Sequence, residues 1–521
     1  MEEKQVRNSG RRLVQMVLIA YLLVLWIGCY SENVEASTPG VRGMWISFLD
    51  YEAAGLYNKP EGEFRQNANL LFEELQSYGI NHVYFQVRAF DDAIYPSKNF
   101  KFSKYMAKGT PNYDPLHILI EAAHSHKISF HAWINPYRIT YDKIYNPAEE
   151  ATIKRIVNGV MEIVVKYKVD GIQFDDYFYP AKGEGQPYSK VSVAKRKQNV
   201  NKMLREVYRQ IKKKDSSVVF GVSPAGERSY AESIGCDIST WLSQKGYMDY
   251  IIPQIYWSNQ YKMNGKVCSL FSSRLEEWNM LNQNNTPMYI GLGLYRAGMA
   301  SDVDLQWTRS TNVISGQIKE LTKKGNKGYV LFSYRFIKAN DACKKEMKNY
   351  LKQLRKPKVN VSRLTITAGE QKALKVSVWP SRASQKVSWK IFNSKELKMK
   401  KNFIVAGKRA GTTVITLKAG ANEKRVTVKV LPPKARGLKV KKQKKACKIS
   451  WKKVKHADGY VIYRSRKQKG PFKRIQKVKK NYILVELKKK KKKYYYRIKA
   501  YEKISGKTYY SKASNKVQVR H

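Results

Sequence analysis

The chain has 521 residues, of which 43% are hydrophobic, and carries a formal net charge of +58. This length suits more than one domain, and this hydrophobic content excludes a chain that is disordered throughout. The charge is uneven, because residues 354–521 hold 52 Lys and Arg against only 6 Asp and Glu. A polycation of this kind attracts polyanions without specifying which one.

The first residues have the pattern of an export signal. Basic residues up to Arg12 precede an apolar run from about Leu13 to Ile27, and a small-residue cleavage site ends at Ala36. We therefore predict a signal peptide over residues 1–36, with lipidation of Cys29 or a retained membrane anchor as alternatives. An exported protein of the cell wall, cell surface or medium is not expected to meet nucleic acid.

Residues 40–355 alternate between strand-like and helical patterns. Strands are expected within 41–49, 81–90, 128–138, 169–180, 217–226, 248–257, 287–296 and 328–336. Helices are expected at 65–78, 115–127, 147–168, 191–214, 270–281, 314–324 and 341–354, with Asp114 as the N-cap of the second. Eight strands that alternate with helices over this length predict a (β/α)8 TIM barrel.

The fourth strand, in the stretch VDGIQFDDYFYP at 169–180, runs into two adjacent carboxylates, Asp175 and Asp176. Side chains alternate between the faces of a strand, so Gln173, Asp175 and Tyr177 are expected to share the inner face. Polar groups at the carboxyl end of a barrel strand are typical of an active site. The alternative is that the two carboxylates only cap the following loop.

Polar and aromatic residues follow the other strands as well. A mixture of flat rings, amides and charged groups suits sugars, whose faces stack on aromatic rings and whose hydroxyls need directed hydrogen bonds. The predicted substrate-binding residues are Arg42, Trp45, Gln86, Arg88, Asp92, Asn135, Tyr137, Tyr177, Gln254, Tyr256 and Trp257. No phosphate-binding loop, nucleophile elbow or metal-ligand spacing follows any strand, so neither a cofactor nor a metal is predicted, although rim carboxylates could hold a weak Ca²⁺.

The motifs RGMWISF, YFQVRAFDDAIYPS, HAWINPYR, DGIQFDDYFYP, GVSPAG and PQIYW occur in this order. Together they resemble the glycosyl-hydrolase-like family 10 barrels of the bacterial envelope, over about residues 40–340. The resemblance implies a (β/α)8 fold and action on glycan, with peptidoglycan strands as the implied substrate. The segment from Ala225 to Arg228 departs from the family pattern, which leaves the fine specificity open.

Glycoside cleavage normally needs two carboxyl groups on opposite sides of the bond. Asp175 is predicted to be the inward carboxylate, acting either as acid/base or as the group that orients a substrate acetamide, with Asp176 as the second candidate. Crowding by a like charge would keep one of the two protonated. The opposing partner is predicted to be Glu227, Asp91, Asp92 or the N-acetyl group of the substrate itself.

The last third of the chain has short alternating strands and regular turns, which predict two all-β sandwiches. After a predicted linker at 356–361, residues 359–433 resemble a bacterial Ig-like group 2 domain through VSVWP, VSWKI and TTVITLKA. Residues 434–521 resemble a fibronectin type III domain through KISWKKV, ADGYVIYRS and YYYRIKAY, with Trp451 as its core tryptophan.

These patterns predict an exported glycoside hydrolase that cleaves cell-wall glycan, with residues 354–521 attached to anionic wall or surface polymer. Two alternatives remain at this stage: a non-catalytic glycan-binding barrel, and a surface adhesin that acts through its basic sandwiches.

Overall fold

A computed structural model of the chain describes residues 40–180, 188, 190–392, 396–400, 403–486 and 492–520. The chain divides into two compact units, Met1–Leu351 and Lys352–His521. The predicted signal peptide and Cys29 lie outside the described residues. Within the described ranges, no helix has both the length and the apolar character needed to cross a membrane.

The first unit is built on one parallel sheet of eight strands. The strands are β1 (Val41–Ile46), β2 (His82–Arg88), β5 (Ser129–Ile134), β6 (Gly171–Asp175), β7 (Val219–Ser223), β8 (Tyr250–Ile251), β11 (Tyr289–Leu292) and β12 (Gly328–Leu331). Their spatial order is β11-β12-β1-β2-β5-β6-β7-β8. Isolated parallel bridges join Ile251 to Met288 and Gln254 to Gly291, so β8 meets β11 and the sheet closes. The predicted (β/α)8 barrel is confirmed.

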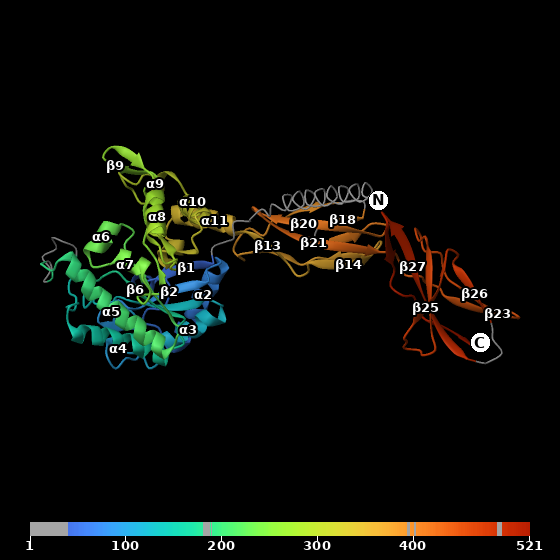
Figure 1. The fold of residues 1–521 in the computed structure, drawn as a ribbon, viewed down its shortest axis with the longest axis horizontal. Helices are drawn as coiled ribbons and strands as arrows, with labels where there is room; N and C mark the ends of the chain where they lie inside the picture. The colour runs from blue at the N-terminus through green and yellow to red at the C-terminus, as the bar shows by residue number, and fades with distance from the viewer. Residues whose placement is uncertain are drawn as a thin grey trace, which may run out of the picture. The chain divides into compact units, whose positions relative to one another are not determined.

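Helices follow the strands and cover the outside of the barrel (Figure 1). They are α2 (Glu61–Ser77), α3 (Pro115–Ser125), α4 (Glu150–Lys166), α5 (Val193–Lys214), α6 (Arg228–Ser233), α7 (Ile238–Ser243), α8 (Leu270–Leu281), α9 (Gln306–Arg309), α10 (Val313–Lys323) and α11 (Asp341–Leu354). The predicted cap of α3 is confirmed, because the Asp114 side chain accepts a hydrogen bond from the His117 amide. The short pairs β3 (Asp92–Ala93) with β4 (Lys101–Phe102), and β9 (Tyr261–Met263) with β10 (Lys266–Cys268), lie in loops.

Aromatic side chains fill the interior of the barrel. Trp45, Tyr84, Trp133 and Tyr250 form one buried cluster with Ile252 and Val330. Glycine at an inward strand position makes room for such a ring: a Cβ atom on Gly221 would lie 2.1 Å from the Tyr250 ring. The barrel is therefore a packed core, and chemistry is confined to its rim.

The second unit contains two sandwiches, each with its own core. The first has the strands β14 (Arg363–Thr367), β15 (Gln371–Ala373), β16 (Val376–Trp379), β17 (Ser388–Ile391), β18 (Leu397–Lys400), β19 (Phe403–Ala406), β20 (Gly411–Ala419) and β21 (Asn422–Leu431). The second has β22 (Lys439–Lys442), β23 (Ala446–Ser450), β24 (Gly459–Ser465), β25 (Lys473–Val478), β26 (Tyr482–Glu486), β27 (Lys493–Ile504), β28 (Lys507–Tyr510) and β29 (Val517–Arg520). Trp451 is buried in the second core, as predicted. Two all-β sandwiches after a barrel are thus confirmed as the fold class.

The predicted linker at 356–361 is wrong in its first part. Residues Lys356–Val359 form the strand β13, which pairs antiparallel with β16. The backbone hydrogen bonds of this segment are made inside the second unit, so it belongs to the first sandwich and does not act as a free connection.

Candidate active site

Asp175 and Asp176 lie where β6 ends, and both are buried, with 7% and 8% of their surfaces exposed. The Asp175 Oδ1 atom accepts hydrogen bonds from the Gln254 Nε2 atom at 3.0 Å and from the Asp176 amide at 3.0 Å. The Asp176 Oδ2 atom accepts one from the Ala225 amide at 2.7 Å. The carboxylates are therefore held by the loops after β7 and β8 and do more than cap their own turn.

The environment of this dyad favours its protonated form. Burial raises the pKa of Asp175 to about 6, although hydrogen bonds from the Asp176 amide and Gln254 and the charge of Arg138 oppose the rise. Burial and the neighbouring charge of Asp175 raise the pKa of Asp176 as well. Two adjacent carboxyl groups in a low-dielectric site titrate as a pair, so one proton stays on the dyad over a wide pH range.

The strand faces are as predicted for Gln173 and Asp175. The Gln173 Oε1 atom accepts a hydrogen bond from the Trp45 indole at 3.3 Å across the barrel interior, and its amide donates to the Ser223 hydroxyl at 2.5 Å. The interleaved Phe174 is fully buried and contacts Phe220 of β7, ring centroids 4.9 Å apart. The Tyr177 side chain lies beyond the end of the strand and is 45% exposed.

A pocket of about 720 Å³ opens beside the dyad, at the carboxyl ends of β7, β8 and β11. Its lining combines aromatic rings, amides and charged groups: Ala225, Gly226, Glu227, Ser229, Tyr230, Ser233, Gln254, Tyr256, Trp257, Tyr295 and Arg296. Gln254 lines this pocket and also donates a hydrogen bond to Asp175. The pocket and the dyad therefore form one site.

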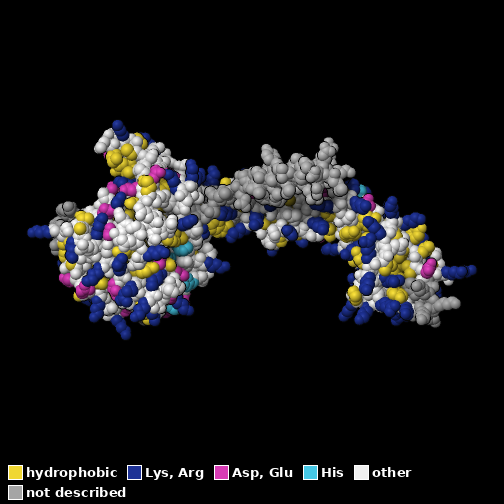
Figure 2. Space-filling view, viewed as in Figure 1, with side chains coloured by type: hydrophobic (Ala, Val, Ile, Leu, Met, Phe, Trp, Pro, Cys, Tyr) yellow, Lys and Arg dark blue, Asp and Glu magenta, His cyan; other side chains and the backbone are white. Residues whose placement is uncertain are grey.

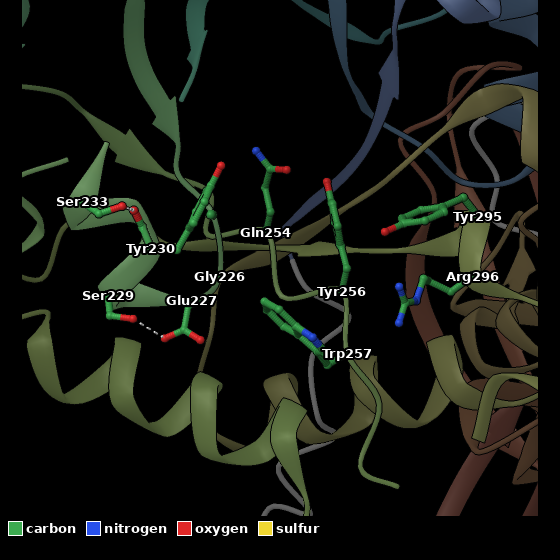
Figure 3. Close-up of a pocket in the computed structure, with 11 residues that line it drawn as sticks. Gly226, Glu227, Ser229, Tyr230, Ser233, Gln254, Tyr256, Trp257, Tyr295 and Arg296 are labelled. Carbon is green, nitrogen blue, oxygen red and sulfur yellow. Dashed lines mark hydrogen bonds between the residues drawn. The ribbon is translucent and has the colours of Figure 1, made fainter. Parts of the chain in front are cut away.

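Figure 3 shows how the polar groups of the pocket are arranged. The phenols of Tyr230 and Tyr256 and the amide of Gln254 point the same way, from α6 and from the segment after β8. The Tyr256 ring is positioned by Tyr295 and Phe332, with centroids 5.6 and 5.9 Å away. Burial, followed by the charge of Asp175, raises the pKa of Tyr256, so this phenol keeps its proton and can donate a hydrogen bond.

Glu227 lies in the pocket lining, at the start of α6. One carboxylate oxygen accepts from the Ser229 hydroxyl at 2.9 Å, and the other pairs with the Arg274 guanidinium at 2.8 Å. The structure thus brings Glu227 to the same pocket as Gln254 and gives it a cationic partner. The Trp257 ring lies beside Tyr256 in this pocket (Figure 3).

A second group of aromatic side chains lies on the other side of the dyad and surrounds Arg138. The Arg138 guanidinium is 4.0 Å from the centroid of the Tyr177 ring, 5.3 Å from that of Tyr141 and 5.4 Å from that of Phe90. Tyr141 is 61% exposed. Because the charge of Arg138 also lowers the pKa of Asp175, this group is electrostatically coupled to the dyad. We call Arg138, Tyr141 and Tyr177 the aromatic platform.

Four of the predicted binding residues are buried supports inside the rim. Trp45, Gln86, Asn135 and Tyr137 are each no more than 2% exposed. The Gln86 amide oxygen accepts from the Phe48 amide at 3.1 Å, and the Asn135 amide donates to the Ala89 carbonyl at 2.9 Å. These residues position the rim loops and have little surface left for a substrate.

The structure does not bring Arg42, Arg88, Asp91 or Asp92 to the dyad. Arg42 is the second residue of β1, and its guanidinium donates to the carbonyl of Gly79, which precedes β2, so it lies at the opposite end of the barrel. Arg88 is buried against the Phe100 ring, 3.4 Å from its centroid. Asp91 pairs with Arg155 of α4 at 2.7 Å. Asp92 accepts from the Phe90 amide within its own turn at 3.1 Å.

Other site residues were not among the predicted ones. Tyr230, Ser229 and Ser233 enter the pocket from α6, which is too short to show a helical period in the sequence. Arg138 follows the third predicted strand, whereas Tyr141 joins the platform only through contacts across loops, which no local pattern reveals. Among the described residues, no group of three or more His, Cys, Asp or Glu side chains is placed to hold a metal ion.

The chain is similar to known proteins. The curated glycosyl hydrolase YngK of Bacillus subtilis (strain 168) is 28% identical over 362 residues, covering 57% of this chain and 69% of the relative. The glycosyl hydrolase DigH of Escherichia coli (strain K12) is 28% identical over 365 residues, covering 56% of this chain and 80% of the relative. Among solved structures, the chitinase ChiA74 from Bacillus thuringiensis matches with a TM-score of 0.40 at 10% identity, covering 93% of this chain and 100% of that one. The model of the glycosyl hydrolase-like 10 family matches residues 40–155 and 140–309, more than half of the chain, and the chain therefore belongs to the glycosyl hydrolase-like 10 family.

Proposed function

We propose that this protein is a glycoside hydrolase that cleaves O-glycosidic bonds in cell-wall glycan, with peptidoglycan strands as its substrate. The observation that supports this most directly is the buried Asp175–Asp176 dyad, hydrogen-bonded to Gln254 at the edge of an aromatic pocket. Carboxyl groups with raised pKa values beside a cleft are typical of catalytic acids. The two curated relatives are themselves named glycosyl hydrolases.

In this proposal Asp175 is the general acid. Its carboxyl group keeps a proton at mildly acidic pH, because burial raises its pKa to about 6, and it delivers that proton to the oxygen of the leaving sugar. Asp176, held by the Ala225 amide, shares a proton with Asp175 and so keeps the pair from carrying two charges. Tyr256 donates a hydrogen bond to the reacting sugar or to its acetamide group. The Gln254 nitrogen already donates to Asp175 and to the Ser223 carbonyl, so the Gln254 amide oxygen accepts from the substrate.

The opposing group is Glu227, which acts as the base or nucleophile from the far wall of the pocket. Its ion pair with Arg274 fixes the carboxylate in place and orients it. If the substrate acetamide supplies the nucleophile instead, Glu227 only shapes the pocket. The two routes differ in what Glu227→Gln does: a loss of several orders of magnitude in turnover follows from the first, and a small loss from the second.

Sugar rings are bound on both sides of the dyad. The pocket presents Tyr230, Tyr256 and Trp257 on one side, and the aromatic platform presents Tyr141 and Tyr177 on the other. Stacking of sugar faces on exposed rings gives affinity, while the amides and charged groups between them set orientation. A chain of several sugars is the ligand that spans both.

We further propose that the protein is exported through its first 36 residues and held at the envelope by its basic second unit. The two sandwiches are proposed to be an Ig-like group 2 domain over 359–433 and a fibronectin type III domain over 434–521. With 52 Lys and Arg against 6 acidic residues over 354–521, attraction to an anionic envelope polymer is the simplest account of their composition.

The test is release of reducing ends from purified peptidoglycan, with and without stem peptides, by the full chain and by its Asp175→Asn, Asp176→Asn and Glu227→Gln variants. Loss of release in the Asp175 variant, with folding and glycan binding retained, supports the hydrolase.

Saturable binding by the wild type without release on any wall glycan would instead favour a glycan-binding barrel, an alternative supported by the engagement of Glu227 with Arg274. If the barrel neither releases reducing ends nor binds glycan, the surface adhesin is the alternative that remains.

A further inference from the structure

The second unit contains a pocket of about 680 Å³ that is surrounded by cationic side chains. Five lysines and one arginine line it: Lys434, Arg436, Lys452, Lys453, Lys455 and Lys512. They come from three segments of the chain, near 435, 453 and 512. We call this the basic pocket.

Backbone contacts fix the walls of the basic pocket. The Lys452 amide donates to the Arg436 carbonyl at 3.0 Å, which joins two of the three cationic segments. The opposite wall is the turn after β14, where the Glu370 side chain accepts from the Thr367 amide at 2.9 Å. The two sandwiches that supply these walls are themselves joined, because the buried Glu502 carboxylate accepts from the Ala410 amide at 2.9 Å.

The positive charge of the pocket is not neutralised by the protein. In the part of the chain that the structure describes, none of the six cations lies within 4.0 Å of a carboxylate oxygen. Glu370 is the one acidic residue in the lining, against six cations. Figure 2 shows the same imbalance on the visible face of the second sandwich, where Lys and Arg far outnumber Asp and Glu.

We propose that the basic pocket binds a polymer that carries repeated phosphate groups, and that this is the point at which the proposed envelope attachment is made. Lysine ammonium groups act as mobile point charges that can gather around a compact phosphate, whereas planar bidentate recognition of a carboxylate or a phosphate is typically the task of arginine. Five of the six cations are lysines.

A polymer is required because each contact is weak. All six cations are exposed, so water and salt screen the attraction of any one of them for a single phosphate. A chain of phosphates occupies several of these sites at once, and each bound group raises the effective concentration of the next. Binding is therefore expected to depend on ligand length and to fall steeply with salt.

The test compares two variants of the full chain that lose the same charge. Lys452→Gln/Lys453→Gln/Lys455→Gln alters the pocket, and Lys441→Gln/Lys442→Gln/Lys444→Gln alters exposed lysines outside its lining. The probe is inorganic polyphosphate of defined length, with polygalacturonate as the carboxylate polymer, at several salt concentrations. Unchanged melting temperatures check the fold.

We expect the pocket variant to bind polyphosphate at least tenfold more weakly, with the slope of log K against log salt reduced by about one for each lost contact. The affinity of the control variant for polyphosphate should fall by no more than about threefold. Equal losses in both variants, or tighter binding of polygalacturonate by the wild type, overturn the proposal.

Hydrolysis of soluble glycan should be the same in both variants and the wild type. If all three fail to hydrolyse glycan while the pocket variant alone loses polyphosphate, the proposed enzyme is wrong and the basic pocket stands.

Discussion

Replacing Asp175 by Asn should make the protein more stable at neutral pH while abolishing its activity. Burial raises the pKa of Asp175 from its ordinary 3.8 to about 6. In the unfolded chain the carboxyl is already ionised above pH 4, so between about pH 4 and 6 the folded state binds more protons than the unfolded state. Stability therefore falls as pH rises through this window.

The size of the effect follows from the same two values. A difference of about two pKa units, at about 1.4 kcal/mol each, makes ionised Asp175 cost about 3 kcal/mol of folding free energy at pH 7. Asn has nearly the same shape, keeps an oxygen for Gln254 and the Asp176 amide, and cannot ionise. The free energy of unfolding of the variant should thus exceed that of the wild type by up to about 3 kcal/mol at pH 7 and by almost nothing near pH 3.5.

The assay is urea unfolding of wild type and variant at several pH values between 3.5 and 7. Asp50→Asn is the matched control, because Asp50 is buried as well but both of its carboxylate oxygens face donors. Oδ1 accepts from the Ser333 hydroxyl and the Arg335 amide, each at 2.8 Å, and Oδ2 accepts from the Ser47 amide at 2.7 Å. In the Asn variant the amide nitrogen replaces one of these oxygens and faces donors, so the free energy of unfolding should fall by about 1–3 kcal/mol. If Asp175→Asn is destabilising at pH 7, or if its effect does not change with pH, the account of the dyad given above is refuted.

Two further predictions concern the barrel. Gln254→Leu removes the amide that lowers the pKa of Asp175, so the basic limb of the pH profile of kcat/KM should move to higher pH and kcat/KM should fall about 10–100-fold. An unmoved limb would contradict the role of this hydrogen bond. The control is Gln210→Leu in α5, which removes a half-buried amide that donates to Glu206. Gly221→Ala places a methyl group 2.1 Å from the Tyr250 ring and should lower the unfolding free energy by about 3 kcal/mol or more, as measured by thermal melts. Its control is Gly62→Ala, where an added Cβ meets nothing within 4 Å, and this variant should be neutral or slightly stabilising.

The sequence predicted the barrel well because its strands and helices have strong, regular patterns with clear caps. Strand β8 is shorter than its apolar run suggests, since Pro253 has no amide hydrogen for a ladder and the strand continues only as isolated bridges. The inner positions of Gln173 and Asp175 followed from simple alternation. The identity of the two sandwiches as Ig-like and fibronectin type III modules stays a prediction.

The binding residues were predicted less well, for two physical reasons. A β-bulge between Gln86 and Arg88 shifts the register of β2 by one residue, so Arg88 faces away from the interior although simple alternation places it with Gln86. Arg42 shows the second reason: as the second residue of its strand it lies at the amino end of the barrel, whereas the site is built at the carboxyl ends of the strands. Tyr177 of the aromatic platform is among the predicted binding residues, but its grouping with Arg138 and Tyr141 depends on contacts between separate loops and has no local signal.

The closure of the barrel has a consequence for motion. Seven neighbouring pairs of strands are joined by ladders, but β8 and β11 meet only through isolated bridges. The pocket lies across this seam, with Gln254 and Tyr256 on one side and Tyr295 and Arg296 on the other. Opening is easiest where ladder hydrogen bonds are fewest. A ligand that touches both sides would add a link across this seam, next to the hydrogen bond from Gln254 to Asp175 that is already present, and would hold the two walls of the pocket together.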